Sequence, residues 1–218
     1  MALRPYIGFM ARPSSRKRAR PRAYHHGDLK AALVEAAVEI LHREGLEGLT
    51  LRAVARKAGV SQAAPYRHFP DRRALMAAVA ERGFQRMQQA MLEGMSGGQG
   101  RLGLKAVAIA YVRFARENPQ EYRLMFGSEL ANTDDLPSLR DTGRSVLGFV
   151  AEGIGQLQKA GLVGEGDPKL MAAATWSALH GLSMLILDGQ TAGVAPNVDA
   201  LVEEATRIMM FGMAGRKP

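Results

Sequence analysis

One stretch, Leu49–Phe69, constrains the fold of this chain more than any other, because it combines start and stop signals for two short helices. Thr50 is a good N-cap, since its hydroxyl accepts a hydrogen bond from a free backbone N–H group. Gly59 suits the left-handed position that ends a helix. We therefore expect a first helix at Leu51–Ala58, a tight turn, and a second helix at Gln62–Arg67. Such a pair is a helix-turn-helix, whose second helix enters the major groove of DNA.

The same residues resemble a known family. The motifs T-x-R-x-V-A-x-x-A-G-V-S from Thr50, Y-x-H-F from Tyr66 and D-R-x-A-L at Asp71–Leu75 are similar to the DNA-binding domain of the tetracycline-repressor (TetR) family of transcriptional regulators. The match covers about Tyr24–Leu75 and involves several positions at fixed spacing. Further along the chain, Thr175–Gly181 resembles the W-x-x-x-H-G signature of one TetR subgroup's C-terminal domain.

One departure from the family pattern falls inside the second helix. Pro65 stands where family members often carry an aliphatic residue. Proline has no backbone N–H, and its ring presses on the carbonyl of the residue four positions earlier, here Ser61. We therefore expect a distorted first turn, with Ser61 still acting as the cap.

Positive charge is concentrated in and before this motif. Residues 1–75 contain 15 Lys and Arg against 6 Asp and Glu, whereas the rest contains 14 basic and 15 acidic residues. This asymmetry is typical of a protein that binds a polyanion. The run Arg16–Arg22 lies in a segment, residues 1–23, that we expect to be a disordered basic arm. Two interpretations of the arm stay open: a solvated tail, or extra contacts with phosphates or the minor groove.

Apolar residues recur at helical spacing along the rest of the chain, and no strand-like alternation is found. We expect an all-α protein of about nine helices. Residues 24–72 form the three-helix DNA-binding domain, with the motif at 50–69, and residues 73–218 form a larger effector-binding and dimerisation domain. Besides the two helices of the motif, the expected helices are Asp28–Arg43, 71–95, Arg101–Glu117, 119–126, Ser138–Ala160, Asp167–Asp188 and Val198–Met213.

The DNA-binding candidates follow from helix-turn-helix geometry. The start of the second helix meets base edges, so Gln62 is expected to bond adenine, and Ala63 and Ala64 to contact thymine methyls or allow close packing. Arginines near the motif are expected to neutralise phosphates, although a solvated face explains any single one. The resemblance places Tyr and His on the phosphate backbone. The full set is Thr50, Arg52, Arg56, Ser61, Gln62, Ala63, Ala64, Tyr66, Arg67, His68 and Arg72.

Catalysis is not expected. The sequence has no cysteine and none of the H-x-x-x-H, G-x-S-x-G, phosphate-loop or dinucleotide patterns, so we predict no enzyme activity, cofactor or metal site. Absence of cysteine fits a cytoplasmic location. Leu170–Leu187 has eighteen residues without Asp, Glu, Lys or Arg. It is borderline for a membrane span, and burial at a subunit interface explains it better.

The resemblance implies an all-α homodimer, usually a repressor, that leaves a palindromic DNA operator when a small molecule binds its C-terminal domain. The alternative is a nucleoid-type protein that binds DNA without sequence preference. The resemblance also implies that the last two helices of each subunit form the dimer interface. The residues expected there are Leu182, Leu185, Leu201, Ala205 and Ile208.

A small-molecule pocket is expected between the DNA-binding domain and that interface. Its large apolar residues predict an apolar or aromatic effector, with Arg113, His180 and the Tyr111 hydroxyl as candidate polar groups. The other interpretation is that these residues simply fill the core. The candidate lining is Phe84, Met87, Tyr111, Phe114, Tyr122, Phe126, Phe149, Trp176 and His180.

Overall fold

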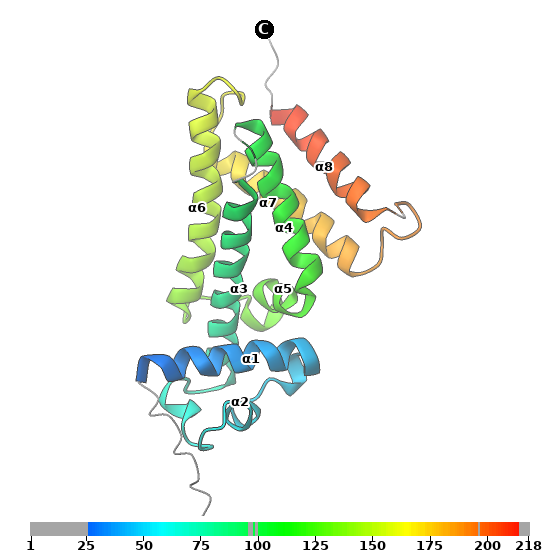
Figure 1. Ribbon diagram of the computed structural model, residues 1–218. Helices are drawn as coiled ribbons and strands as arrows, with labels where there is room; N and C mark the ends of the chain where they lie inside the picture. Colours follow the sequence, from blue (N-terminus) through cyan, green and yellow to red (C-terminus); the bar gives the residue numbers. More distant parts are fainter. Residues whose placement is uncertain (1–25, 96–97, 99, 196, 214–218) are drawn as a thin grey trace, which may run out of the picture.

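The computed structural model describes residues 26–95, 98, 100–195 and 197–213, so the expected basic arm lies outside the described residues. Within them the chain is all-helical, as predicted, with eight α-helices and two short 3₁₀ turns instead of nine helices (Figure 1). The elements are α1 (His26–Gly48), α2 (Leu51–Lys57), η1 (Pro65–Arg67), α3 (Arg72–Met95), α4 (Arg101–Glu117), α5 (Pro119–Phe126), η2 (Ser128–Leu130), α6 (Pro137–Lys159), α7 (Pro168–Leu187) and α8 (Val198–Met213).

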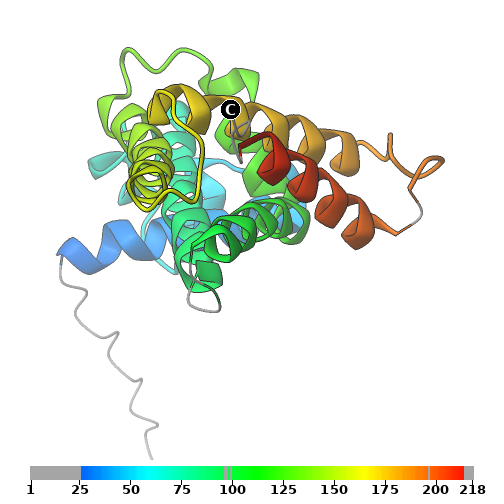
Figure 2. The ribbon, with the colours of Figure 1, turned by 90° about the horizontal axis from the view of Figure 1, so that it is seen from above.

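The long helix α3 organises the molecule. Its N-terminal end packs on α1, and the rest of it packs against α4, α5 and α6 (Figure 1). Helices α1 and α2 form one end of the molecule, and α6, α3 and α4 rise from it. Seen from above, α7 and α8 lie together on one side of this bundle (Figure 2). A single helix therefore connects the helix-turn-helix directly to the larger helical part.

Sequence signals fix most helix ends. The side chains of Asp71, Asp167 and Asn197 accept hydrogen bonds from the backbone N–H groups of Ala74 (2.8 Å), Lys169 (2.9 Å) and Ala200 (3.1 Å). These contacts satisfy donors that have no partner inside the helix. Asn118 is the N-cap residue of α5, but its side chain makes no capping hydrogen bond. Its amide nitrogen donates back to the Phe114 carbonyl at 3.0 Å, and Pro119 at the first helical position has no N–H to satisfy.

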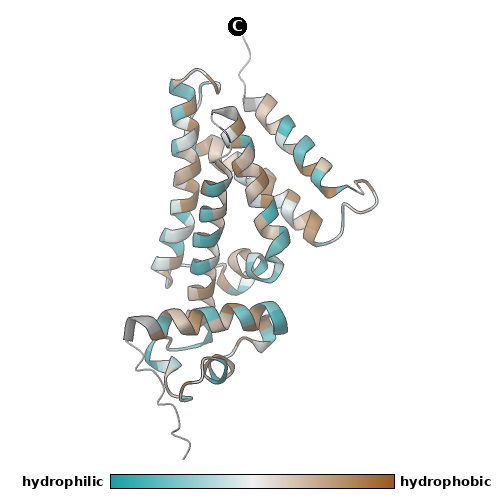
Figure 3. Cartoon of the chain, in the orientation of Figure 1, coloured by the Kyte–Doolittle hydropathy of each residue, from teal (hydrophilic) through white to brown (hydrophobic). Residues whose placement is uncertain are grey.

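The hydrophobic core is continuous from α1 to α8. It begins with Leu33, Leu41 and Val54, passes through α3, and continues to Tyr122 and Leu179. In Figure 3 apolar residues follow the inner faces of these helices, while α8 alternates apolar and polar bands. This core spans both expected domains. Because it is closely packed along α3, a displacement of one domain is coupled to the position of the other. The domain boundary at residue 73 stays a prediction.

Candidate functional site

The first helix of the motif is built as predicted. The Thr50 hydroxyl accepts from the Ala53 N–H at 3.1 Å. After the helix, Gly59 has φ +69°, and Val60 N–H donates to Ala55 at 3.0 Å while Gly59 N–H donates to Arg56 at 3.3 Å. These two bonds form a Schellman motif, which needs the left-handed glycine. The turn is thereby fixed, and so is the direction in which the following segment leaves.

The predicted second α-helix at Gln62–Arg67 is wrong in type. Only Pro65–Arg67 is regular, and it is a 3₁₀ turn. Pro65 cannot donate to the Ser61 carbonyl, which instead accepts from the Ala64 N–H at 3.0 Å. Without the α-type bond at Pro65, the turn tightens to contacts three residues apart. The missing ninth helix is this segment, 61–69, which we call the reading segment.

The reading segment presents small and polar side chains to solvent. Ser61, Gln62 and Ala63 are exposed and Ala64 is half-buried. Farther along, Tyr66 and Arg67 are exposed and His68 is half-buried. Pro65 and Phe69 are buried and hold the segment on the core. An exposed edge anchored by two buried side chains is what reading DNA bases requires.

Arginines around the motif divide into two groups. Arg52, Arg56 and Arg67 are exposed and make no ion pair with any described residue. Arg72 is engaged elsewhere, since its guanidinium donates to the Leu49 and Leu46 carbonyls. Arg72 therefore supports the loop after α1, and its predicted phosphate contact stays a prediction. The first three keep free charge for a polyanion.

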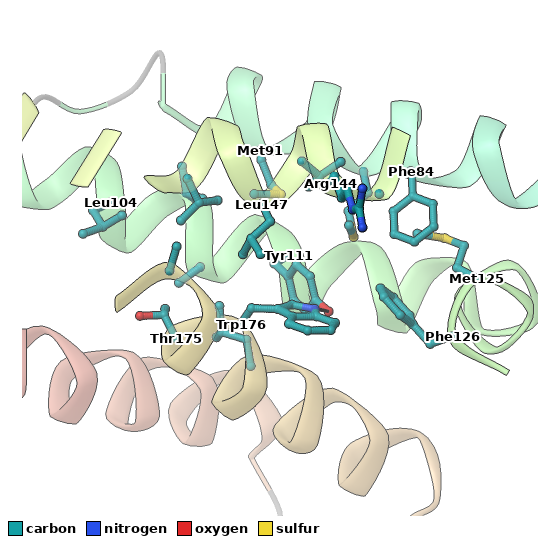
Figure 4. Close-up of a pocket in the computed structure, with 18 of the residues that line it drawn as sticks. Phe84, Met91, Leu104, Tyr111, Met125, Phe126, Arg144, Leu147, Thr175 and Trp176 are labelled. Carbon is teal, nitrogen blue, oxygen red and sulfur yellow. Dashed lines mark hydrogen bonds between the residues drawn. The ribbon is translucent and has the colours of Figure 1, made fainter. Parts of the chain in front are cut away.

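A cavity of about 450 Å³ lies in the larger helical part, within the size range of small-molecule sites. Helices α3 to α8 and η2 all contribute to its lining (Figure 4). Five of the nine residues predicted for the pocket are there: Phe84, Met87, Tyr111, Phe126 and Trp176.

Four predicted pocket residues, and Arg113, do not line this cavity. Phe114 is buried beneath the Arg86 guanidinium, Tyr122 is fully buried behind the wall, and Phe149 packs on the main core. Arg113 faces a separate polar groove between α4 and α8. The spacing on each helix was compatible with the pocket, but Phe114 and Tyr122 are buried in the packing between helices and Arg113 is exposed on another face.

His180 also lies behind the wall, at the end of a chain of hydrogen bonds. Trp176 donates from its indole N–H to the Tyr111 hydroxyl at 3.1 Å. The Tyr111 and Tyr122 hydroxyls are 2.7 Å apart, and Tyr122 lies 2.8 Å from Nδ1 of His180. Burial raises the pKa of Tyr111 far above its ordinary value and that of Tyr122 to about 12. Both tyrosines therefore stay protonated, and one consistent arrangement has Tyr122 donating to a neutral His180.

Partial burial lowers the pKa of His180, which agrees with the neutral form. Trp176 and His180, four residues apart on α7, are thus tied to α4 and α5 through the two tyrosines. Only Trp176 and Tyr111 also face the cavity. The W-x-x-x-H spacing therefore joins three helices at the cavity wall.

A buried ionic cluster joins the cavity to the helix-turn-helix. Glu121 on α5 is fully buried, and its Oε2 accepts from Arg86 at 2.5 Å and lies 3.4 Å from Nε2 of His42 on α1. Its other oxygen has no hydrogen-bond partner among the described residues. Arg86 also donates to Asn118 at 3.0 Å. No sequence pattern predicted this cluster, because Glu121, Arg86 and His42 lie on three different helices.

Close packing fixes α5 against α3. A β-carbon on Gly83 would lie 2.6 Å from Sδ of Met125, so a larger residue there would force the Met125 side chain to shift. Met125 and Phe126 line the cavity, while Glu121 one turn earlier holds Arg86 and His42. One short helix therefore touches the cavity at one end and the DNA-binding end of the molecule at the other.

The last two helices carry an exposed apolar face. On α7 it contains Leu170 (69% exposed) and Leu185 (50%), and on α8 Ile208 (58%) and Phe211 (78%). Of the predicted interface residues, Leu201 and Ala205 are half-buried and Leu182 packs against the core of its own chain. We call Leu170, Leu185, Ile208 and Phe211 the α7–α8 face. Among the described helices, α7 alone is long and apolar enough to cross a membrane.

A capped helix-turn-helix joined to a larger all-α body defines the class of helix-turn-helix DNA-binding regulators. Residues 33–79 match the family model described as bacterial regulatory proteins, tetR family, and residues 104–209 match the one described as tetracyclin repressor-like, C-terminal domain. The chain belongs to the TetR family of transcriptional regulators. DNA binding through the matched N-terminal domain and dimerisation are typical of that family.

Individual relatives agree with this assignment. An uncharacterized HTH-type transcriptional regulator, YobS of Bacillus subtilis, is 34% identical over 90 residues, 41% of this chain and 47% of that protein. Tetracycline repressor protein class C of Escherichia coli is 46% identical over 52 residues, 24% of each chain. The match thus spans half or less of these curated relatives. A protein of unknown function from Rhodococcus sp. RHA1 has a similar structure, with a TM-score of 0.78, 33% identity, and 89% and 100% of the two chains covered.

Proposed function

We propose that this protein is a homodimeric, sequence-specific repressor that leaves a palindromic operator when a small apolar molecule fills its cavity. The observation that carries the proposal is the capped α2 followed by an exposed, anchored reading segment. Two such segments in a dimer suit two half-sites about one helical turn apart, roughly 34–36 Å. The expected location is the cytoplasm, where the operator would be.

Base reading is assigned to Gln62 and Ala63, and phosphate contacts to Arg52, Arg56 and Arg67. All five are exposed on the same end of the molecule. A Gln side chain pairs with adenine through two hydrogen bonds, while alanine offers a methyl contact to thymine. The proposal therefore separates sequence reading from charge-driven affinity, which makes each testable by a different substitution.

Dimerisation is assigned to the α7–α8 face. Half or more of each of its four large apolar side chains is exposed within one chain. A second copy covering this face would bury them and explain why α7 is apolar around so much of its surface. Leu182 is a weaker candidate than the sequence indicated, because it already packs on its own core.

Release by a ligand is assigned to α5 and α3. A molecule in the cavity contacts Met125 and Phe126 on α5, and the same helix holds His42 of α1 through Glu121. A ligand that fits one placement of α5 better than another shifts the placement of the DNA-binding end. Operator affinity then falls by the ligand's differential binding free energy. We also infer membership of the W-x-x-x-H-G subgroup, supported by the bonded chain from Trp176 to His180.

The test is a selection of bound sequences from a random DNA pool, using the full chain. Sequence-specific binding predicts enrichment of an inverted repeat. A nucleoid-type protein, the alternative, would enrich no motif, and its affinity would depend on salt far more than on sequence. No observation favours that alternative, since charge alone would not need a capped turn and an anchored reading segment.

A further inference from the structure

A single charged side chain lines the cavity. Among the described residues of the lining, only Arg144 on α6 carries a charge, and the others are mostly apolar (Figure 4). Arg144 makes no hydrogen bond or ion pair with any described residue. Sequence patterns gave no reason to single it out, because one arginine on an amphipathic helix normally faces solvent.

Nearby acids do not explain Arg144. Asp141 lies one turn before Arg144, but its carboxylate is paired with Arg140, with 3.7 Å between Oδ1 of Asp141 and Nε of Arg140. Glu129 lies beside the cavity rim, where its Oε2 would be 2.7 Å from a β-carbon on Gly127, and it makes no ion pair with Arg144. Arg144 is an exposed residue at the edge of an apolar space whose described lining holds no anion of its own.

A ligand in this cavity must therefore suit both an apolar wall and an unpaired guanidinium. A neutral ligand would cover part of Arg144, take away its water and return no hydrogen bond, which costs binding free energy. A carboxylate would replace that water with two charge-assisted hydrogen bonds, because the guanidinium fork matches its geometry. The apolar body would then lie against Tyr111, Trp176 and Met91.

We propose that the effector is an apolar monocarboxylate whose acid group binds Arg144. The inference rests on the proposed effector-responsive function and names the chemical class of its ligand. Two sources share this chemistry, aliphatic acids and aromatic acids. Decanoate and 2-naphthoate represent them, and each has a neutral counterpart of similar size, decan-1-ol and 2-naphthamide.

The experiment is calorimetric titration of the full chain with each of the four compounds. At least one acid is expected to bind about tenfold tighter than its neutral counterpart, a modest factor because Arg144 is exposed and solvent screens its charge. Arg144→Gln should abolish this preference, because it removes the guanidinium that pairs with the acid and that a neutral compound must desolvate, while Arg144→Lys should retain part of it. The matched control is Arg140→Gln, one position from Asp141 on the same helix and outside the lining; it should keep the full preference.

Several outcomes overturn the inference. Equal binding of acid and neutral compound, acid preference that survives Arg144→Gln, or no binding of either acid would each exclude it. Circular dichroism checks that each variant is folded. Binding to selected DNA without any added compound is measured in parallel. Wild type that binds DNA specifically but prefers no acid refutes the ligand class and leaves the DNA-binding function standing.

Discussion

The reading segment and the cavity differ in how the chain builds them. The reading segment is contiguous: residues 61–69 follow a turn whose cap, Thr50, and stop, Gly59, lie within a dozen residues. The cavity is assembled from six helices and a 3₁₀ turn. Because the reading segment is contiguous, its DNA-binding residues can be predicted from local spacing in the sequence. Ligand-binding residues depend on which helices become neighbours, and on which face of each helix stays uncovered.

The strongest loss of DNA binding is expected from a substitution outside the reading segment, in the α7–α8 face. Leu185→Glu places a charge in the α7–α8 face, and a dimer would have to bury it unpaired. Sedimentation should show monomers, and operator affinity should fall by about a hundredfold or more as two-site binding is lost. Leu102→Glu is the control, since Leu102 is 70% exposed on α4. Dimers that persist in Leu185→Glu would exclude this face.

The second effect concerns Glu121 on α5, the helix that lines the cavity and contacts α1. Glu121→Gln removes one partner of a buried ion pair and should lower the free energy of unfolding by about 3 kcal/mol, the low end of the usual range, because Arg86 is part-exposed. Urea denaturation measures the change. Glu35→Gln is the control, since its pair with Arg82 is exposed and worth less than about 1 kcal/mol. Equal losses in both variants would show that the cluster does not stabilise the junction.

The third prediction separates base reading by the reading segment from phosphate contacts by α2. Gln62→Ala should cost roughly 1–3 kcal/mol on selected DNA and nothing on scrambled DNA, because it removes base contacts only. Arg52→Ala should weaken binding to both and reduce the slope of affinity against salt by about one unit. Fluorescence anisotropy at several salt concentrations separates the two. If Gln62→Ala weakens both DNAs equally, direct reading at Gln62 is wrong.

The smallest effect belongs to the cavity wall. The pKa of His180 lies below its ordinary value in the folded protein, so the unfolded chain binds more protons as pH falls through about 6.5. The free energy of unfolding should therefore decrease from pH 7 towards pH 5, and less so in His180→Gln. Denaturation at several pH values measures the difference. A steeper loss in the variant would contradict the neutral, hydrogen-bonded His180.

Sequence reasoning succeeded where a residue's role depends on close neighbours. Thr50 and Gly59 were placed correctly because caps and turns are local. Pro65 was recognised as a disturbance of the first turn, but the extent of its effect, a 3₁₀ turn in place of the whole α-helix, was not predicted.

The sequence did not predict features that depend on which helices pack against one another. Phe114 and Tyr122 matched the pocket pattern and are covered by other helices. The bonds from Arg72 to the carbonyls of Leu46 and Leu49 were not expected from the sequence, because the bonded residues are 26 and 23 positions apart. Arg144, the charged member of the lining, carried no local signal, because most other residues that line the cavity lie on helices distant in sequence.

The central claim is that two reading segments, held by one dimer, read two half-sites on one face of DNA. The most direct test compares the selected operator with the same DNA carrying five extra base pairs between the half-sites. The insertion rotates one half-site by about half a helical turn around the DNA axis, so the two half-sites face opposite sides of the DNA. The account predicts that affinity falls to the level of scrambled DNA. Unchanged affinity would show that each subunit binds alone or that binding does not read sequence.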